Sequence, residues 1–129
     1  MGSAYMKKLG FIGMGNMAQA LAMGFINAKA IAKENVYAYA PHQEKLLKNA
    51  ETIGFTPVAT LKDLARSVDT LVMACKPYQI EAVINELGKA LEDKALISIA
   101  AGWDIAKYRQ FITTNTRLQF IMPNTPAMV

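Results

Sequence analysis

The sequence contains a single cysteine, Cys75, among its 129 residues. No disulfide can form within the chain, and such cysteine usage is typical of proteins in a reducing cytoplasm. No apolar run approaches the roughly 20 residues that a helix needs to cross a bilayer. The first residues also lack the charged-then-apolar pattern of a signal peptide. These absences predict a cytoplasmic protein that does not bind a membrane.

Dense clusters of charge are missing as well. The 14 basic and 10 acidic residues give a formal net charge of +4, and no basic run with interleaved aromatics predicts nucleic-acid binding. A mild positive balance suits an anionic small ligand. No group of His, Cys, Asp and Glu has metal-ligand spacing, so no metal site is expected. The composition, 53% hydrophobic and 19% charged, predicts a folded core rather than disorder.

The length fits one domain, and no linker or internal repeat divides the chain. Residues 1–5 resemble an expression leader ahead of a native start at Met6. We therefore expect one domain over residues 6–129.

Short apolar segments alternate with segments of helical periodicity. The expected strands are 9–12, 36–40, 55–58, 70–75, 95–99 and 118–121. The expected helices are 16–29, 43–53, a short one opened by a capping box at Thr60 and Asp63, 77–91, and one that Asp104 caps and that ends near Phe111. Buried strands separated by helices predict an α/β fold of the Rossmann type, a doubly wound and mostly parallel sheet flanked by helices.

A glycine-rich turn, Gly13-Met14-Gly15-Asn16-Met17-Ala18, follows the first expected strand and opens the first expected helix. This is the context that the dinucleotide-binding fingerprint requires. Gly13 permits the tight turn, Gly15 lets a pyrophosphate approach the backbone, and Ala18 lets the helix pack closely on the strand. The N–H groups at the start of the helix then face the phosphates. The alternative is a tight turn without a ligand.

The end of the second expected strand carries no acid. An NAD-selective site places Asp or Glu there, on the ribose 2′-hydroxyl, whereas this chain has Ala40-Pro41-His42-Gln43. The absence removes a repulsion that a 2′-phosphate would suffer, so NADP is favoured and NAD remains possible. His42, Gln43 and Lys45 are the candidate contacts, and the alternative for His42 is an exposed loop residue.

Four stretches together resemble the pyrroline-5-carboxylate reductase family. They are Phe11 to Ala18, Asp69 to Pro77, Ile97 to Gly102, and Met122-Pro123-Asn124-Thr125-Pro126. They span nearly the whole chain in the order that the family has them.

The resemblance implies NADPH-dependent reduction of the imino acid 1-pyrroline-5-carboxylate to L-proline, in proline biosynthesis. It assigns cofactor binding to Ile12, Gly13, Met14, Gly15, Asn16, Met17, Ala40, Pro41, His42, Ala74, Cys75, Lys76, Pro77, Ile99, Ala100 and Ala101. It places Met122, Pro123, Asn124 and Thr125 on the substrate side. Members of the family continue into a helical dimerisation domain that this chain lacks. A homodimer or larger homo-oligomer is therefore expected of the full-length protein, with little turnover by this part alone.

Two positions depart from the family pattern. Phe120 stands where an arginine is usual, and Trp103 stands where a smaller aliphatic residue is usual. The phenylalanine bears on the electrostatics near the active site.

No residue of this chain is assigned as catalytic. Lys76 is a candidate general acid, with a cofactor-side or structural role as its alternative, and water is another source of the proton. Cys75 is read as a small buried hydrophobe rather than a nucleophile. Asn124 is a candidate hydrogen-bonding partner for substrate or nicotinamide, or simply a turn residue. Two other functions stay open, namely another imine or β-hydroxyacid NADP oxidoreductase and a non-catalytic nucleotide-binding module.

Overall fold

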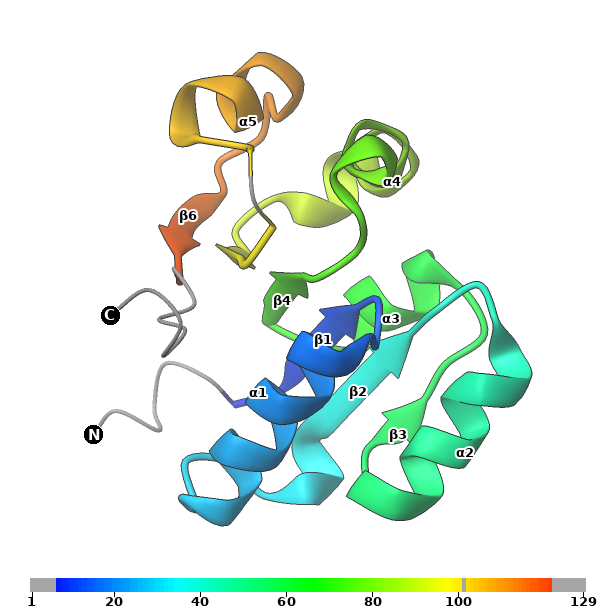
Figure 1. Cartoon of the computed structure of the whole chain (residues 1–129). Coiled ribbons are helices and arrows are strands. Elements are labelled where there is room, and N and C mark those ends of the chain that lie inside the picture. Colours follow the sequence, from blue (N-terminus) through cyan, green and yellow to red (C-terminus); the bar gives the residue numbers. More distant parts are fainter. Residues whose placement is uncertain (1–6, 101, 122–129) are drawn as a thin grey trace, which may run out of the picture.

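The computed structural model describes residues 7–100 and 102–121, which form a parallel sheet of six strands with helices on both faces (Figure 1). The strand order is β3-β2-β1-β4-β5-β6. The strands are β1 (Leu9–Ile12), β2 (Val36–Tyr39), β3 (Thr56–Pro57), β4 (Thr70–Met73), β5 (Ala95–Ser98) and β6 (Arg117–Phe120). The reversal of strand order beside β1 is the doubly wound arrangement. The predicted Rossmann class is confirmed, and every strand pair of the sheet is parallel.

Five α-helices and three short 3₁₀ segments connect the strands of the described part. The α-helices are α1 (Asn16–Asn27), α2 (Gln43–Ile53), α3 (Leu61–Ser67), α4 (Ile80–Leu87) and α5 (Ile105–Phe111). The 3₁₀ segments are η2 (Lys33–Asn35), η3 (Pro77–Gln79) and η4 (Gly88–Leu91). Figure 1 shows α4 and α5 together, away from α2 and β3.

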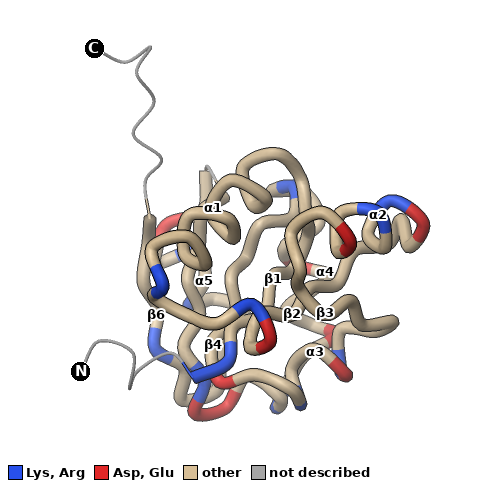
Figure 2. The backbone as a smooth tube through the Cα atoms, turned by 90° about the horizontal axis from the view of Figure 1, so that it is seen from below, with Lys and Arg blue, Asp and Glu red and all other residues tan. Residues whose placement is uncertain are grey.

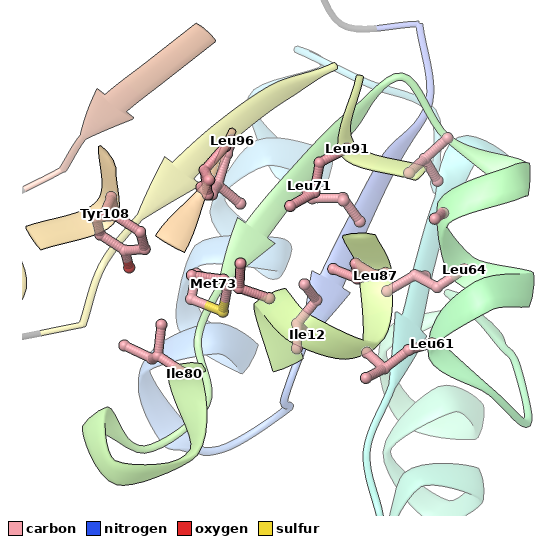
Figure 3. Close-up of a cluster of buried hydrophobic side chains, with 14 of the residues drawn as sticks. Ile12, Leu61, Leu64, Leu71, Met73, Ile80, Leu87, Leu91, Leu96 and Tyr108 are labelled. Carbon is pink, nitrogen blue, oxygen red and sulfur yellow. The ribbon is translucent and has the colours of Figure 1, made fainter. Parts of the chain in front are cut away.

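Two hydrophobic clusters occupy the two faces of the sheet. Side chains of α1 and α2, among them Ala18 and Leu46, pack with Phe11 and Val72 on one face. Side chains of α3, α4, η4 and α5 pack on the other face against Ile12, Leu71, Met73 and Leu96 (Figure 3). Each large apolar side chain buried in this way contributes about 1.5–3 kcal/mol relative to exposure. The clusters hold the strand ends, and therefore the loops that follow them, in fixed positions.

Several predicted boundaries were wrong. The ends of α1, β2, β3, β5 and β6 differ from the expected ones by one or two residues, and two further differences lie in segments that follow the centre of the sheet. The helix expected over 77–91 is interrupted, because α4 ends at Leu87 and Gly88 adopts a φ of +49°, after which the chain continues as η4. The strand expected over 70–75 ends at Met73. Ala74 and Cys75 instead form the turn that faces the loop after β1.

The predicted cap at Thr60 is present, but only half of the capping box forms. The Thr60 hydroxyl accepts a hydrogen bond from the backbone N–H of Asp63 at 3.0 Å. The Asp63 carboxylate pairs with Arg66, one turn further along α3, instead of turning back to the start of the helix. The start of α3 is therefore fixed by Thr60 alone.

The two residues that depart from the family pattern belong to one aromatic cluster. The ring of Tyr108 in α5 lies 5.1 Å from that of Trp103 and 5.7 Å from that of Phe120. The Trp103 ring also contacts Phe111, and the Lys107 ammonium lies 4.7 Å from its centroid. Phe120 therefore points into the packing between β6 and α5, and its role in this structure is to hold α5 on the sheet.

Charged residues are spread over many elements of the described chain (Figure 2). Within the same residues, no helix is long and apolar enough to cross a membrane.

Candidate functional site

A cleft of about 670 Å³ opens at the carboxyl ends of β1, β2 and β4. Ligands of open α/β sheets bind at this edge, where the strand order reverses. Many of the residues predicted for cofactor binding line it, namely Ile12, Gly13, Met14, Gly15, Asn16, Ala40, Pro41, His42, Ala74, Cys75 and Lys76. The fold thus brings together three segments that are far apart in the sequence.

Gly13 makes the tight turn at the end of β1. Its φ is +96°, a region that side chains with a Cβ rarely adopt. Its N–H donates to the Tyr39 carbonyl at 2.8 Å, which ties the turn to β2. On the other side, a Cβ on Gly13 would lie 3.0 Å from the backbone of Ala74 and Cys75. The positive φ and the closeness of the backbone after β4 therefore both favour glycine here.

Gly15 has the opposite surroundings. It is the N-cap of α1 with an ordinary extended backbone, φ −77° and ψ −172°, and no side chain caps the helix. A Cβ on Gly15 would meet nothing within 4 Å. The open space at Gly15, beside first-turn N–H groups that no side chain caps, fits an anionic group such as a pyrophosphate.

Two further residues stabilise the glycine-rich turn. Ala18, with 1% of its surface exposed, lets α1 pack on the sheet. The side-chain amide of Gln19 donates to the Met14 carbonyl at 3.1 Å and so fixes the middle of the turn.

The end of β2 presents nitrogen-bearing side chains to the cleft. His42 is the N-cap of α2, but its imidazole makes no capping hydrogen bond and is exposed. Lys45 and Asn49, one and two turns into α2, also line the cleft. Gln43 does not, because its side-chain amide donates to the Ala40 carbonyl at 2.7 Å. Of the three candidates for a 2′-phosphate, His42 and Lys45 therefore face the cleft.

The sequence interpretation missed one wall of the cleft. Gln79, Ala82, Val83 and Glu86 line it from α4 and the residue before that helix. Their spacing of i, i+3, i+4 and i+7 is one helical face, which the sequence does contain. Tyr78, 79% exposed, stands beside them at the start of this wall.

Cys75 and Lys76 follow the turn after β4 and line the cleft. Burial raises the pKa of the Cys75 thiol to about 11, so the thiol is neutral near pH 7. A neutral thiol agrees with the interpretation of Cys75 as a hydrophobe rather than a nucleophile, although the residue is half-buried and not fully buried. Lys76 is exposed, and its backbone N–H donates to the Gln79 side chain at 3.1 Å, which starts the segment that leads to α4.

Several predicted residues are not among those that line the cleft. Met17 is 49% exposed in the first turn of α1, and Pro77, Ile99 and Ala100 also lie outside the lining. Ala101, Met122, Pro123, Asn124 and Thr125 fall outside the described residues. Within the described part of the chain, no His, Cys, Asp and Glu side chains gather as a metal site would require.

Residues 8–102 match the family model described as "NADP oxidoreductase coenzyme F420-dependent". The curated pyrroline-5-carboxylate reductase of Treponema pallidum is 34% identical over 125 residues, which are 94% of this chain and 47% of that protein. A Staphylococcus epidermidis protein of the same name is 36% identical over 124 residues, 95% of this chain and 46% of that protein. The chain thus spans about half the length of the curated relatives it matches.

Solved structures agree with these sequence matches. Plasmodium falciparum pyrroline carboxylate reductase, solved with NADP bound, has a TM-score of 0.81 and 35% identity, over 95% of this chain and 44% of that one. The Coxiella burnetii pyrroline-5-carboxylate reductase has a TM-score of 0.85 and 28% identity, over 94% of this chain and 45% of that one. The resemblance inferred from the four motifs is confirmed by both kinds of comparison.

Proposed function

The chain belongs to the family described as coenzyme F420-dependent NADP oxidoreductases, and we propose that it is the cofactor-binding part of a reductase that makes L-proline from 1-pyrroline-5-carboxylate with NADPH. The observation that carries the proposal is the cleft itself. It joins the glycine turn, the acid-free end of β2 and the turn after β4. A relative that shares 35% identity over 95% of this chain was solved with NADP bound.

The cofactor would supply the hydride, and the residues of this chain would bind and orient it. The uncapped N–H groups that begin α1 would hold the pyrophosphate against Gly15. His42 and Lys45 would contact the 2′-phosphate from the end of β2. The assignment of Met122, Pro123, Asn124 and Thr125 to the substrate side remains a prediction from the resemblance. The proton for the imine is likewise unassigned, with water and Lys76 as its candidate sources.

We also infer a cytoplasmic location, because Cys75 is a free thiol. A homodimer or larger homo-oligomer of the full-length protein is inferred from the resemblance. Its small-molecule partner would be the imino acid.

Fluorescence titration of the chain with NADPH and NADH tests cofactor binding. We expect saturable binding of both, with NADPH bound more tightly. Lys45→Ala should weaken NADPH binding by about fivefold, because an exposed ammonium–phosphate contact is worth roughly 1 kcal/mol, and should leave NADH binding unchanged. Lys48→Ala is the matched control, since Lys48 lies on the same helix but does not line the cleft. Failure of either nucleotide to bind would reject the cofactor assignment.

The reaction is tested with the whole protein that carries this chain. We expect NADPH-dependent consumption of 1-pyrroline-5-carboxylate with formation of proline. A whole protein that binds NADPH but does not consume 1-pyrroline-5-carboxylate would refute the assignment. It would leave the two alternatives, another imine or β-hydroxyacid NADP oxidoreductase and a non-catalytic nucleotide-binding module.

A further inference from the structure

The cleft wall made by α4 contains an acidic residue that the assignment of pyrophosphate and phosphate contacts does not use. Glu86 lines the cleft together with Ala82 and Val83. It is exposed, and the single ion pair among the described residues joins Asp63 to Arg66, so Glu86 has no basic partner there. Its carboxylate is therefore available to a ligand.

The position of Glu86 is unfavourable for the helix itself. Glu86 lies in the last turn of α4, which contains no basic residue. The C-terminal end of a helix carries partial negative charge and is destabilised by an added carboxylate. Glu81 stands in the first turn of the same helix, where a carboxylate is favourable. Stabilisation of α4 can therefore account for a carboxylate at Glu81 but not for one at Glu86.

The residues around Glu86 combine apolar side chains with one carboxylate, and this combination suits a flat aromatic base. Leu61 at the start of α3 and Ala82 and Val83 of α4 give this part of the cleft apolar walls. Ala82 lies four residues before Glu86, slightly more than one helical turn or about 6 Å along the axis. Because Ala82 has a small side chain and both residues line the cleft, a ring that lay on Ala82 would have its edge near the Glu86 carboxylate.

The positions proposed for the pyrophosphate and the ribose limit which part of the cofactor can lie beside Ala82 and Glu86. If the pyrophosphate lies against Gly15 and the adenosine ribose lies beside Ala40, the adenine is the remaining flat group on that side of the cleft. Its exocyclic amino group is a hydrogen-bond donor, and a carboxylate only accepts. We propose that Glu86 accepts a hydrogen bond from the adenine amino group and so makes the site selective for adenine. This inference rests on the proposed binding of NADPH in the cleft.

The test compares NADPH with its hypoxanthine analogue, in which a carbonyl oxygen replaces the amino group. The oxygen can only accept a hydrogen bond, and the analogue's nearest proton is on the neighbouring ring nitrogen N1. A carboxylate placed for the amino group would therefore face the oxygen without a proton between them, unless it shifts toward N1. We expect the unmodified chain to bind NADPH about tenfold more tightly than the analogue, at the lower end of the range for a hydrogen bond to a charged group because the site is exposed. Nicotinamide fluorescence reports both ligands.

Glu86→Gln should reduce this preference to less than about threefold, because an amide can accept from adenine and donate to hypoxanthine. Glu81→Gln should keep the tenfold preference and serves as the matched control on the same helix. The midpoint of thermal unfolding should not fall in Glu86→Gln, as expected for a residue that the helix does not need.

The outcomes separate this inference from the proposed function. If neither nucleotide binds the unmodified chain, the proposed function fails. If NADPH binds but the analogue binds equally well, or if Glu86→Gln retains the preference, the adenine contact is overturned. An equal gain in affinity for both nucleotides in Glu86→Gln would show that the carboxylate repels phosphate instead, and this would also overturn it.

Discussion

Gly13 abuts Ala74 so closely that a Cβ atom on Gly13 would lie 3.0 Å from the Ala74 carbonyl oxygen. Since the φ of Gly13 is also positive, Gly13→Ala combines backbone strain with a collision against a backbone that cannot rotate away. We expect it to lower the free energy of unfolding by about 1–3 kcal/mol and to weaken NADPH binding. Urea denaturation and fluorescence titration measure the two effects.

Gly15→Ala is the comparison that separates folding from binding. The Gly15 backbone suits any residue, and the added methyl group enters open space. The free energy of unfolding should stay the same or rise slightly, whereas NADPH affinity should fall at least tenfold because the methyl group occupies the phosphate approach. Unchanged NADPH binding in Gly15→Ala would place the pyrophosphate elsewhere.

Ser98 and Tyr108 share a buried hydrogen bond of 2.7 Å between their hydroxyl groups. Tyr108→Phe should cost about 1 kcal/mol, and Ser98→Ala should cost about 1–3 kcal/mol because it leaves the buried tyrosine hydroxyl without its partner. The double variant should cost less than the sum of the two single changes. A double-mutant cycle from urea denaturation measures this coupling, and strict additivity would contradict the hydrogen bond.

Cys75 should react slowly with iodoacetamide near neutral pH. With a pKa of about 11 instead of the ordinary 9.0, the thiolate fraction at pH 8 is about 0.1% instead of about 10%. The alkylation rate should reach half of its maximum near pH 11 in the folded protein and near pH 9 in the urea-unfolded protein. A folded-state plateau below pH 9 would contradict the raised pKa.

The same shift makes stability depend on pH. Because the folded pKa of Cys75 lies above the unfolded value, its contribution to the free energy of unfolding is complete below about pH 9. That contribution is lost as the pH rises toward about 11. Cys75→Ala should reduce the fall in stability over this interval, as measured by urea denaturation at several pH values.

An arginine at position 120, the residue that the resemblance led us to expect there, should destabilise this chain. Phe120 packs edge-on against Tyr108, and such aromatic pairs contribute about 0.5–1.5 kcal/mol beyond their buried area. We expect Phe120→Arg to cost about 1–2 kcal/mol in thermal or urea unfolding. Gln119→Arg, on the exposed neighbouring position of β6, should cost nothing measurable. Equal effects at both positions would argue against the aromatic cluster.

Most of the fold follows from patterns that a single sequence carries. The runs Leu9 to Ile12 and Leu71 to Met73 are apolar throughout, and such runs form strands that are covered on both faces. Asp104 and Thr60 mark two helix starts because their side chains accept from backbone N–H groups. The break at Gly88 was harder to predict, since helices tolerate an interior glycine and the positive φ depends on how η4 packs.

The site also has a part that the sequence predicts and a part that it does not. Gly13 and Gly15 are needed for the shape of the turn itself, and the dinucleotide-binding fingerprint describes that turn. Their positions in the site could therefore be predicted from the sequence. The α4 wall was not, because Ala82 and Glu86 become part of a cleft only when α4 lies opposite the end of β2. The sequence shows that these residues share a helical face, but it does not show what that face meets.

The position of β1 has a consequence for how the chain acquires its binding loop. β1 pairs with β2 and with β4, and Ile12 accepts the hydrogen bond of the Ala74 N–H across 62 residues of sequence. The glycine turn is held between Tyr39 and Ala74, so it takes its final shape only when both strand ends have docked. Pairing of distant parallel strands is a slow step in folding. The protein should therefore become able to bind a dinucleotide only at the end of folding, when the centre of the sheet is complete. A nascent chain that does not yet extend past β4 should not bind one.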